Sequence, residues 1–109
     1  METTQSQERA ARNEELFREA NEKLGDKRQE LNIDGQTPFL CECSNPECTE
    51  LLHLSLEQYE HVRSQPNWFL LAHGHDGQSA EVAEDHGEYV IVSKAGLAGR
   101  IAEEENPRR

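Results

Sequence analysis

The chain is poor in hydrophobic residues and has no long hydrophobic run. Hydrophobic residues make up 34% of its 109 residues, and the mean hydropathy is -0.92. No apolar run approaches the ~20 residues that a membrane-spanning helix needs. The first residues, Met1–Gln5, lack the basic start and the apolar stretch of a signal peptide. We therefore expect a cytoplasmic protein that does not contact a membrane.

Basic residues are scarce as well. The chain has 11 Lys and Arg against 22 Asp and Glu, which gives a formal net charge of -11. Most of this charge lies beyond residue 32, where 14 acidic and 5 basic residues give -9. A field of this sign repels phosphate backbones, so we expect no direct binding of nucleic acid. A protein partner with a basic patch remains compatible with it.

The part of the chain that can form a core is small. Without its two ends, roughly sixty residues remain, and a domain of this size has a marginal core. Bound metal commonly compensates for such a core, since apparent zinc binding energies in small finger peptides are about 10 kcal/mol or more. A metal ion could therefore decide whether this domain folds.

All three cysteines lie within ten residues, in Phe39–Cys48. Cys41 and Cys43 are two residues apart, so on an extended segment their side chains share a face. The run from Ser44 to Glu47 is typical of a turn that would bring Cys48 back beside them. Three clustered cysteines in a reducing compartment favour metal ligands over disulfides. Buried structural thiols and a thiol-based redox switch are the alternatives.

A closed zinc site needs a fourth ligand. The leading candidates are the histidines of Phe69–His75, namely His73 and His75. Closed coordination would make the zinc structural. Residue spacing leaves the choice between the two histidines open.

Signals of catalysis are weak. The sequence has no Gly-rich phosphate loop and no nucleophile elbow. His73-Gly74-His75-Asp76 lacks the further ligands of a catalytic metal cluster. We expect His53 and His61 at the surface and His86 in a turn. A solvated acidic face explains the remaining acids more simply than an active site does, and we expect no enzyme; these acids are Glu57, Glu60, Glu81, Glu84, Asp85 and Glu88.

Residues 5–32 are predicted to form one long amphipathic helix, with a possible break at Gly25-Asp26. Its thin apolar stripe either packs against the chain's own domain or binds a partner, including a second copy of the chain. The partner-binding residues would be Leu16, Phe17, Ala20 and Leu24. The full stripe also includes Ala10 and Leu31.

The rest of the sequence predicts an α+β fold with a small antiparallel sheet. Strands are expected over 37–43 and 67–73, around Leu52 and Leu54, and in a hairpin of 80–84 with 88–94. Ser55 and Gln58 form a capping box that begins a helix ending at Gln65, before Pro66. We expect three parts: a helical arm over 1–36, a zinc-stabilised domain over 37–95 and a flexible acidic tail over 96–109.

Several segments together resemble a family of small, mostly uncharacterised actinobacterial proteins. The resemblance covers residues from about 10 to 109. That family usually has Pro-Gly-His where this chain has His73-Gly74-His75, so the resemblance implies that His75 is the shared histidine and the fourth ligand. It implies no activity. The segments that carry it are Ala11–Glu14, Phe17-Arg18, Asn21-Glu22, Pro38–Cys43, Cys48–Glu50, Glu57–Arg63, Gly74-His75 and Tyr89–Lys94.

These observations favour a small acidic protein with structural Zn2+ on Cys41, Cys43, Cys48 and His75. We expect an interaction or regulatory adaptor, in transcription or stress signalling, that binds a protein partner through its N-terminal helix. A thiol-based redox or zinc sensor is the alternative. A metal-dependent enzyme is the third choice.

Overall fold

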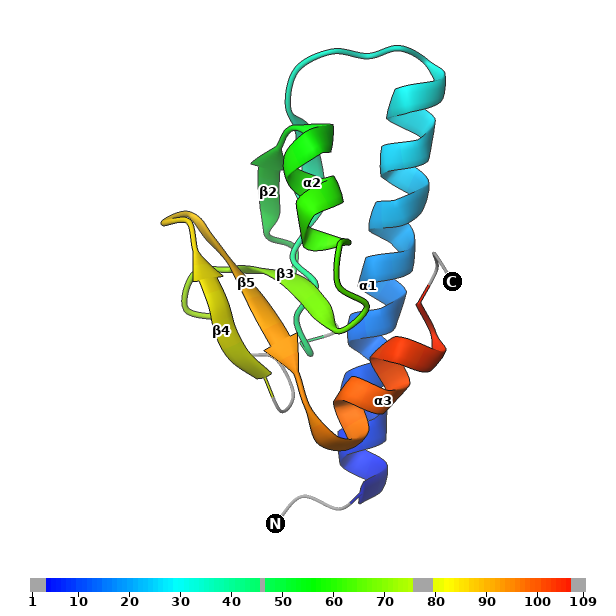
Figure 1. Cartoon of the computed structure of the whole chain (residues 1–109), viewed down its shortest axis with the longest axis vertical. Coiled ribbons are helices and arrows are strands. Elements are labelled where there is room, and N and C mark those ends of the chain that lie inside the picture. Colours follow the sequence, from blue (N-terminus) through cyan, green and yellow to red (C-terminus); the bar gives the residue numbers. More distant parts are fainter. Residues whose placement is uncertain (1–3, 46, 76–79, 107–109) are drawn as a thin grey trace.

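Three helices and five strands make up the part of the chain that the computed structural model describes, which is residues 4–45, 47–75 and 80–106. The α+β fold is confirmed. In chain order the elements are α1 (Thr4–Glu30), β1 (Thr37–Leu40), β2 (Leu51–Leu54), α2 (Leu56–Val62), β3 (Trp68–Ala72), β4 (Ala80–Asp85), β5 (Tyr89–Lys94) and α3 (Gly96–Glu104). Figure 1 shows α1 along one side, with the strands beside it and α3 across its N-terminal half.

The strands form two antiparallel sheets instead of the single predicted one. β1 pairs with β2, and Phe39 lies opposite Leu52. The second sheet has the order β3-β5-β4, so β5 is central, as its apolar Tyr89–Val92 run predicts. The predicted hairpin is confirmed as β4 and β5, with an irregularity in β4 between Val82 and Glu84.

Helix α2 begins at the predicted capping box. Ser55 Oγ accepts a hydrogen bond from the Gln58 backbone at 3.1 Å, and Gln58 Oε1 accepts one from the Ser55 backbone at 2.8 Å. Tyr59 and Val62 are buried, and the Tyr59 ring stacks on Phe39 at 4.2 Å. The helix ends at Val62, earlier than the predicted Gln65.

One hydrophobic core joins both sheets and α2. Its buried members come from β1, β2, α2, β3, β5 and α3, so neither sheet has a separate interior. The two-stranded sheet could not be stable alone, because a single hairpin buries too little apolar surface. These core residues are Phe39, Leu52, Leu54, Tyr59, Val62, Phe69, Leu70, Leu71, Ala72, Val90, Ile91, Val92 and Ala102, with Cys41 and Cys43.

The inward face of α1 is largely polar, which the sequence pattern did not predict. Its fully buried side chains include Glu14, Arg18 and Asn21. The predicted apolar stripe is only partly covered. Leu16 and Leu31 are 64% and 55% exposed and Ala20 is exposed, whereas Phe17 is half-buried and Leu24 packs against the core. The possible break at Gly25 does not occur.

Arg18 shows how a charged residue is accommodated inside. Its guanidinium donates hydrogen bonds to the carbonyls of Pro66, at 2.6 Å, and Ala102, at 2.7 Å, and lies over the Phe69 ring. It also pairs with Glu15, whose pKa is raised to about 7 because burial disfavours the carboxylate more than Arg18 stabilises it. Arg18 therefore connects α1 to two segments far along the chain.

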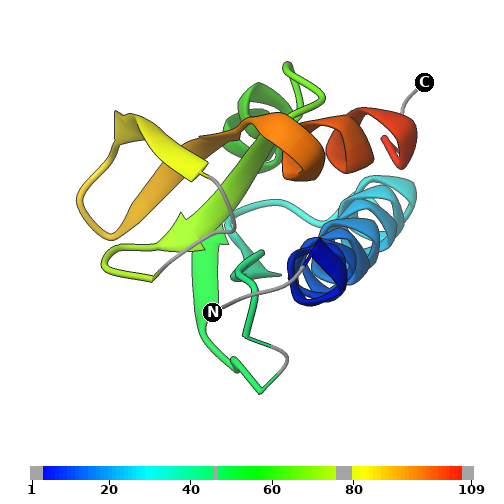
Figure 2. The same ribbon diagram turned by 90° about the horizontal axis from the view of Figure 1, so that it is seen from below.

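The predicted flexible tail is wrong for residues 96–104, which form α3. Ile101 and Ala102 are buried, and Ile101 packs with Ala11 of α1. Gly96 has a φ of 59°, in the left-handed region that favours glycine, and a Cβ at position 99 would lie 3.0 Å from the Lys94 carbonyl oxygen. Both glycines therefore serve this turn and packing. Figure 2 shows α3 beside α1.

The division of the chain at residues 36 and 95 stays a prediction about folding units. Helix α1 contacts β1 and α3 along its length, as the alternative of a helix packed on its own domain requires. The end of the predicted tail, residues 107–109, lies outside the described residues.

Candidate metal centre

The segment after β1 carries two of the three cysteines. β1 ends at Leu40, whereas the predicted strand extended to residue 43. Backbone hydrogen bonds on both sides nevertheless hold the residues that follow. Cys41 N donates to the Glu50 carbonyl at 3.2 Å, and Glu42 N donates to the Leu70 carbonyl at 2.7 Å. These bonds keep the segment extended between β2 and β3, so Cys41 and Cys43 project to one side.

A turn then brings back the third cysteine. Asn45 organises it: its side-chain oxygen accepts from Glu47 N at 3.0 Å, and its carbonyl accepts from Cys48 N at 3.1 Å. The predicted turn is confirmed for these residues, while Pro46 lies outside the described ones. Cys48 is thereby placed beside the first two cysteines.

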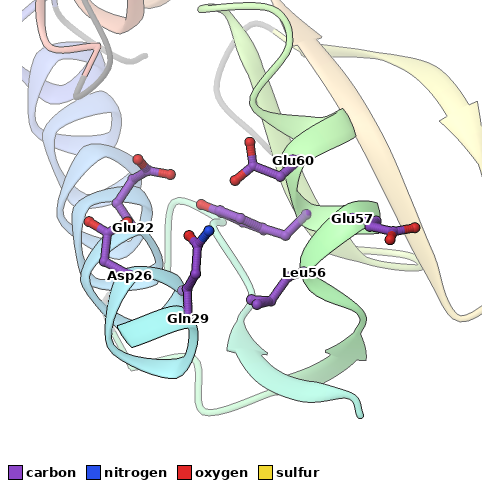
Figure 3. Close-up of a pocket in the computed structure, with 8 residues that line it drawn as sticks. Glu22, Asp26, Gln29, Leu56, Glu57 and Glu60 are labelled. Carbon is purple, nitrogen blue, oxygen red and sulfur yellow. The ribbon is translucent and has the colours of Figure 1, made fainter. Parts of the chain in front are cut away.

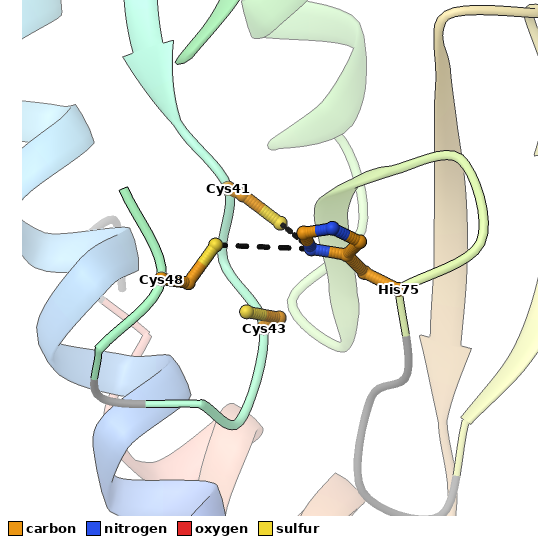
Figure 4. Close-up of side chains that lie close together, drawn as sticks. All are labelled: Cys41, Cys43, Cys48 and His75. Atoms are coloured by element: carbon orange, nitrogen blue, oxygen red, sulfur yellow. Dashed lines mark hydrogen bonds between the residues drawn. The ribbon is translucent and has the colours of Figure 1, made fainter. Parts of the chain in front are cut away.

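The histidine comes from the far end of β3. The strand ends at Ala72, and His75 N donates to the Ala72 carbonyl at 3.0 Å. Gly74 has a φ of 88°, in the left-handed region that favours glycine. This turn directs the His75 ring back toward the cysteines, as Figure 4 shows.

Four donor atoms converge at this point. One ligand atom from each of Cys41, Cys43, Cys48 and His75 lies within 4.8 Å of the others. His75 Nδ1 is 3.4 Å from Cys41 Sγ and 3.7 Å from Cys48 Sγ. A tetrahedral zinc site with Zn–S of about 2.3 Å and Zn–N of about 2.0 Å places sulfur and nitrogen roughly 3.5 Å apart. The arrangement therefore fits zinc in both donor type and spacing.

The other predicted candidate histidine lies elsewhere. The His73 side chain is 60% exposed, and its Nε2 is 3.5 Å from Asp85 Oδ2. Within the described residues, the group of donors that could hold a metal ion contains His75 and not His73. Asp76, the last residue of the His-Gly-His-Asp run, lies outside the described residues.

Burial makes Cys41 and Cys43 poor thiolates without a cation. It raises the pKa of both the Cys41 and Cys43 thiols, and a hydrogen bond from Ala72 N to Cys41 Sγ at 3.2 Å only partly offsets this for Cys41. A coordinated zinc ion deprotonates its thiol ligands and supplies the missing positive charge. A metal ion would therefore stabilise the thiolate forms of Cys41 and Cys43.

Comparison with known proteins adds no relative. The chain matches no family model, and no curated protein or solved structure is similar to it. The interpretation of the site thus rests on its four donors and their geometry.

A hollow adjoins the four donors. Its volume is about 360 Å³, and it is bordered by Cys43, Ser44, Asn45, Gly74 and His75. Because three sulfurs and one nitrogen complete a tetrahedron, a zinc ion held by all four would have no open position for substrate. The hollow gives solvent access to the edge of the site.

Glu42, between Cys41 and Cys43, is a central residue that the sequence pattern did not reveal. It is fully buried, and its carboxylate accepts hydrogen bonds from Tyr59, Arg63, Asn21 and the Leu70 backbone at 2.8 to 2.9 Å. The one available signal was its position: in an extended segment it faces opposite to both cysteines. That face points into the core.

A separate pocket of about 190 Å³ lies between α1 and α2. Glu22, Asp26 and Gln29 of α1 face Leu56 and Glu60 of α2, as Figure 3 shows. Gly25, Glu57 and Tyr59 also line it. Its lining carries four carboxylates and no Lys, Arg or His, so the pocket is acidic.

Among the described residues, no helix combines the length and the apolar character needed to cross a bilayer.

Proposed function

We propose that this chain is a zinc-binding protein in which the metal is structural. The observation that carries the proposal is the convergence of Cys41, Cys43, Cys48 and His75 within 4.8 Å. Zinc there would join the cysteine segment to the end of β3, two parts of the chain separated in sequence. A core this small gains stability from such a link.

Metal analysis tests the proposal. Protein purified without a histidine tag should contain one zinc per chain, and His75→Ala should lose it. His73→Ala is the matched control, because it removes an exposed imidazole two residues away, and it should keep its zinc. Well under one zinc per chain in the wild type would contradict the proposal.

We further propose that the zinc-stabilised domain is an interaction or regulatory adaptor, in transcription or stress signalling, and not an enzyme. Two observations support a protein partner. Leu16 on α1 is 64% exposed, so its apolar side chain is accessible to a partner. The pocket between α1 and α2 is bordered by four carboxylates, which suits a basic partner surface.

Substitution at the surface tests this role better than deletion of α1, because Arg18 and Asn21 hold the core. Wild type and Leu16→Glu should be compared for partners that co-purify with the native protein. A true partner should be lost with Leu16→Glu, should be retained with Leu31→Glu, an exposed leucine just after the end of α1, and should dissociate as salt rises. Equal capture by both variants would exclude the Leu16 surface.

A redox or zinc sensor is the second candidate, and the accessibility of the site favours it. Cys48 is only half-buried, and the hollow beside Cys43 and His75 is open to solvent. Hydrogen peroxide would oxidise two of the thiolates to a disulfide by removing two electrons. With two protons, the peroxide would be reduced to two water molecules, and zinc would leave the site.

Peroxide titration with a zinc-sensitive dye separates the two candidates. A structural site resists mild oxidant and releases little metal. A sensor releases one zinc per disulfide formed and recovers it after reduction.

A further inference from the structure

Two histidines and one glutamate from separate elements meet beside the β4–β5 turn. His61 is on α2, Glu84 on β4 and His86 in the turn. His61 Nε2 lies 2.9 and 3.1 Å from the two carboxylate oxygens of Glu84, and His86 Nε2 lies 2.8 Å from Glu84 Oε1. The Glu84 carboxylate thus lies between two imidazoles. The sequence had predicted only that His61 is at the surface and His86 in a turn.

Aromatic neighbours hold both imidazole rings. His86 stacks on Tyr89 with ring centres 4.8 Å apart and planes inclined by 14°. His61 meets Trp68 edge to face at 5.5 Å. The rings are therefore oriented by packing as well as by Glu84, which lowers the entropy that a ligand bound to them would have to remove.

Space is available beside the two rings. A groove of about 290 Å³ is bordered by both histidines and by Gln58, Tyr89 and residues at the start of α2. The groove can admit a hydrated ion to the ring nitrogens. The histidine and glutamate side chains are 32% to 51% exposed, so small rotations of them cost little packing.

We propose that His61, Glu84 and His86 form a second metal site, which binds a divalent transition metal such as Zn2+. Two imidazoles and a carboxylate are a usual donor set for this class of ion, and three protein ligands leave a coordination position for water. In the present arrangement each imidazole contacts Glu84 directly. The ion replaces these hydrogen bonds and draws the three side chains around itself, so the second site binds more weakly than the preformed cysteine site and exchanges its metal.

Equilibrium dialysis of the full-length, untagged protein against ZnCl2, followed by metal analysis, tests the proposal. The wild type should bind two zinc ions per chain. The double variant His61→Ala with His86→Ala should lose one of them. His73→Ala, which removes an exposed imidazole with one carboxylate neighbour, should still bind two.

The result also separates this site from the cysteine site. His75→Ala should lose a different equivalent and keep the one that depends on His61 and His86. Failure of the cysteine site alone would leave one zinc in the wild type and none in the double variant. If the double variant binds as much zinc as the wild type, or if His73→Ala loses the same equivalent, the proposal is overturned.

Discussion

The carboxylate of Glu42 and the guanidinium of Arg63 form an ion pair in the core, with 2.8 Å between Oε1 and Nη2 and side-chain exposures of 0% and 2%. Every other group bonded to this carboxylate is also a donor: the Asn21 amide, the Tyr59 hydroxyl and the Leu70 backbone N–H. A single acidic residue between Cys41 and Cys43 therefore connects the candidate metal centre to α1, α2 and β3.

Removal of this carboxylate should be strongly destabilising. Glu42→Ala leaves Arg63 as an uncompensated buried charge, and we expect a loss of about 3–5 kcal/mol in the free energy of unfolding. Glu42→Gln should also destabilise, because its NH2 group would face donors. Urea unfolding of zinc-loaded protein measures both, with the exposed Glu57→Ala as control. If Glu42→Ala lowers the free energy of unfolding no more than the control does, the stabilising role of the Glu42 carboxylate is contradicted.

Asn21 should be needed to hold α1 on β1. Its amide donates to the Leu40 carbonyl and to Glu42, and its oxygen accepts from Leu40 N, each at 2.8 Å. Asn21→Ala leaves these buried groups unsatisfied, and we expect a loss of about 1–3 kcal/mol. Asn21→Asp should be worse, since it places a second carboxylate beside Glu42. Thermal unfolding checks the order, with Lys23→Ala on the exposed face as control.

Zinc binding should release protons and weaken as pH falls. Because burial raises the pKa of Cys41 and Cys43, both thiols are protonated in the metal-free protein at neutral pH, whereas the bound form is thiolate. Calorimetric titrations of zinc in buffers with different ionisation enthalpies should show at least two protons released per ion. Affinity should therefore rise with pH through the neutral range. An affinity independent of pH there would exclude thiolate ligands.

Helix α3 should contribute to global stability. Ile101 is 3% exposed and packs on Ala11, so Ile101→Ala should cost about 2–5 kcal/mol, as large-to-small core substitutions do. Arg100→Ala, at an exposed position of the same helix, is the control. Equal denaturation midpoints for the two variants would contradict a stabilising role of α3 and would support the predicted flexible tail.

The sequence was sufficient to predict features that depend on residues close together along the chain. The cysteine segment depends on the two-residue spacing of Cys41 and Cys43 and on turn chemistry, and the start of α2 depends on Ser55 and Gln58. All of these interactions span only a few residues, so spacing and residue type predict them.

Features that depend on distant partners could not be predicted in this way. Glu14 and Arg18 are polar residues on a helix, and they would ordinarily face solvent. Their burial is stabilised by Lys94, 80 residues after Glu14, and by the Ala102 carbonyl, 84 residues after Arg18. The same holds for α3, which was predicted to be a flexible tail, whereas Gly99 fits closely against the Lys94 backbone and Ile101 packs on Ala11 of α1.

X-ray absorption spectroscopy at the zinc edge can test directly whether Cys41, Cys43, Cys48 and His75 coordinate zinc. The sample is untagged protein dialysed to one equivalent of zinc. We expect a four-coordinate ion with three sulfurs at about 2.3 Å and one nitrogen at about 2.0 Å. His75→Ala should remove the nitrogen contribution or the metal itself. A coordination shell of nitrogen and oxygen without sulfur, or a protein that retains no zinc, would contradict it.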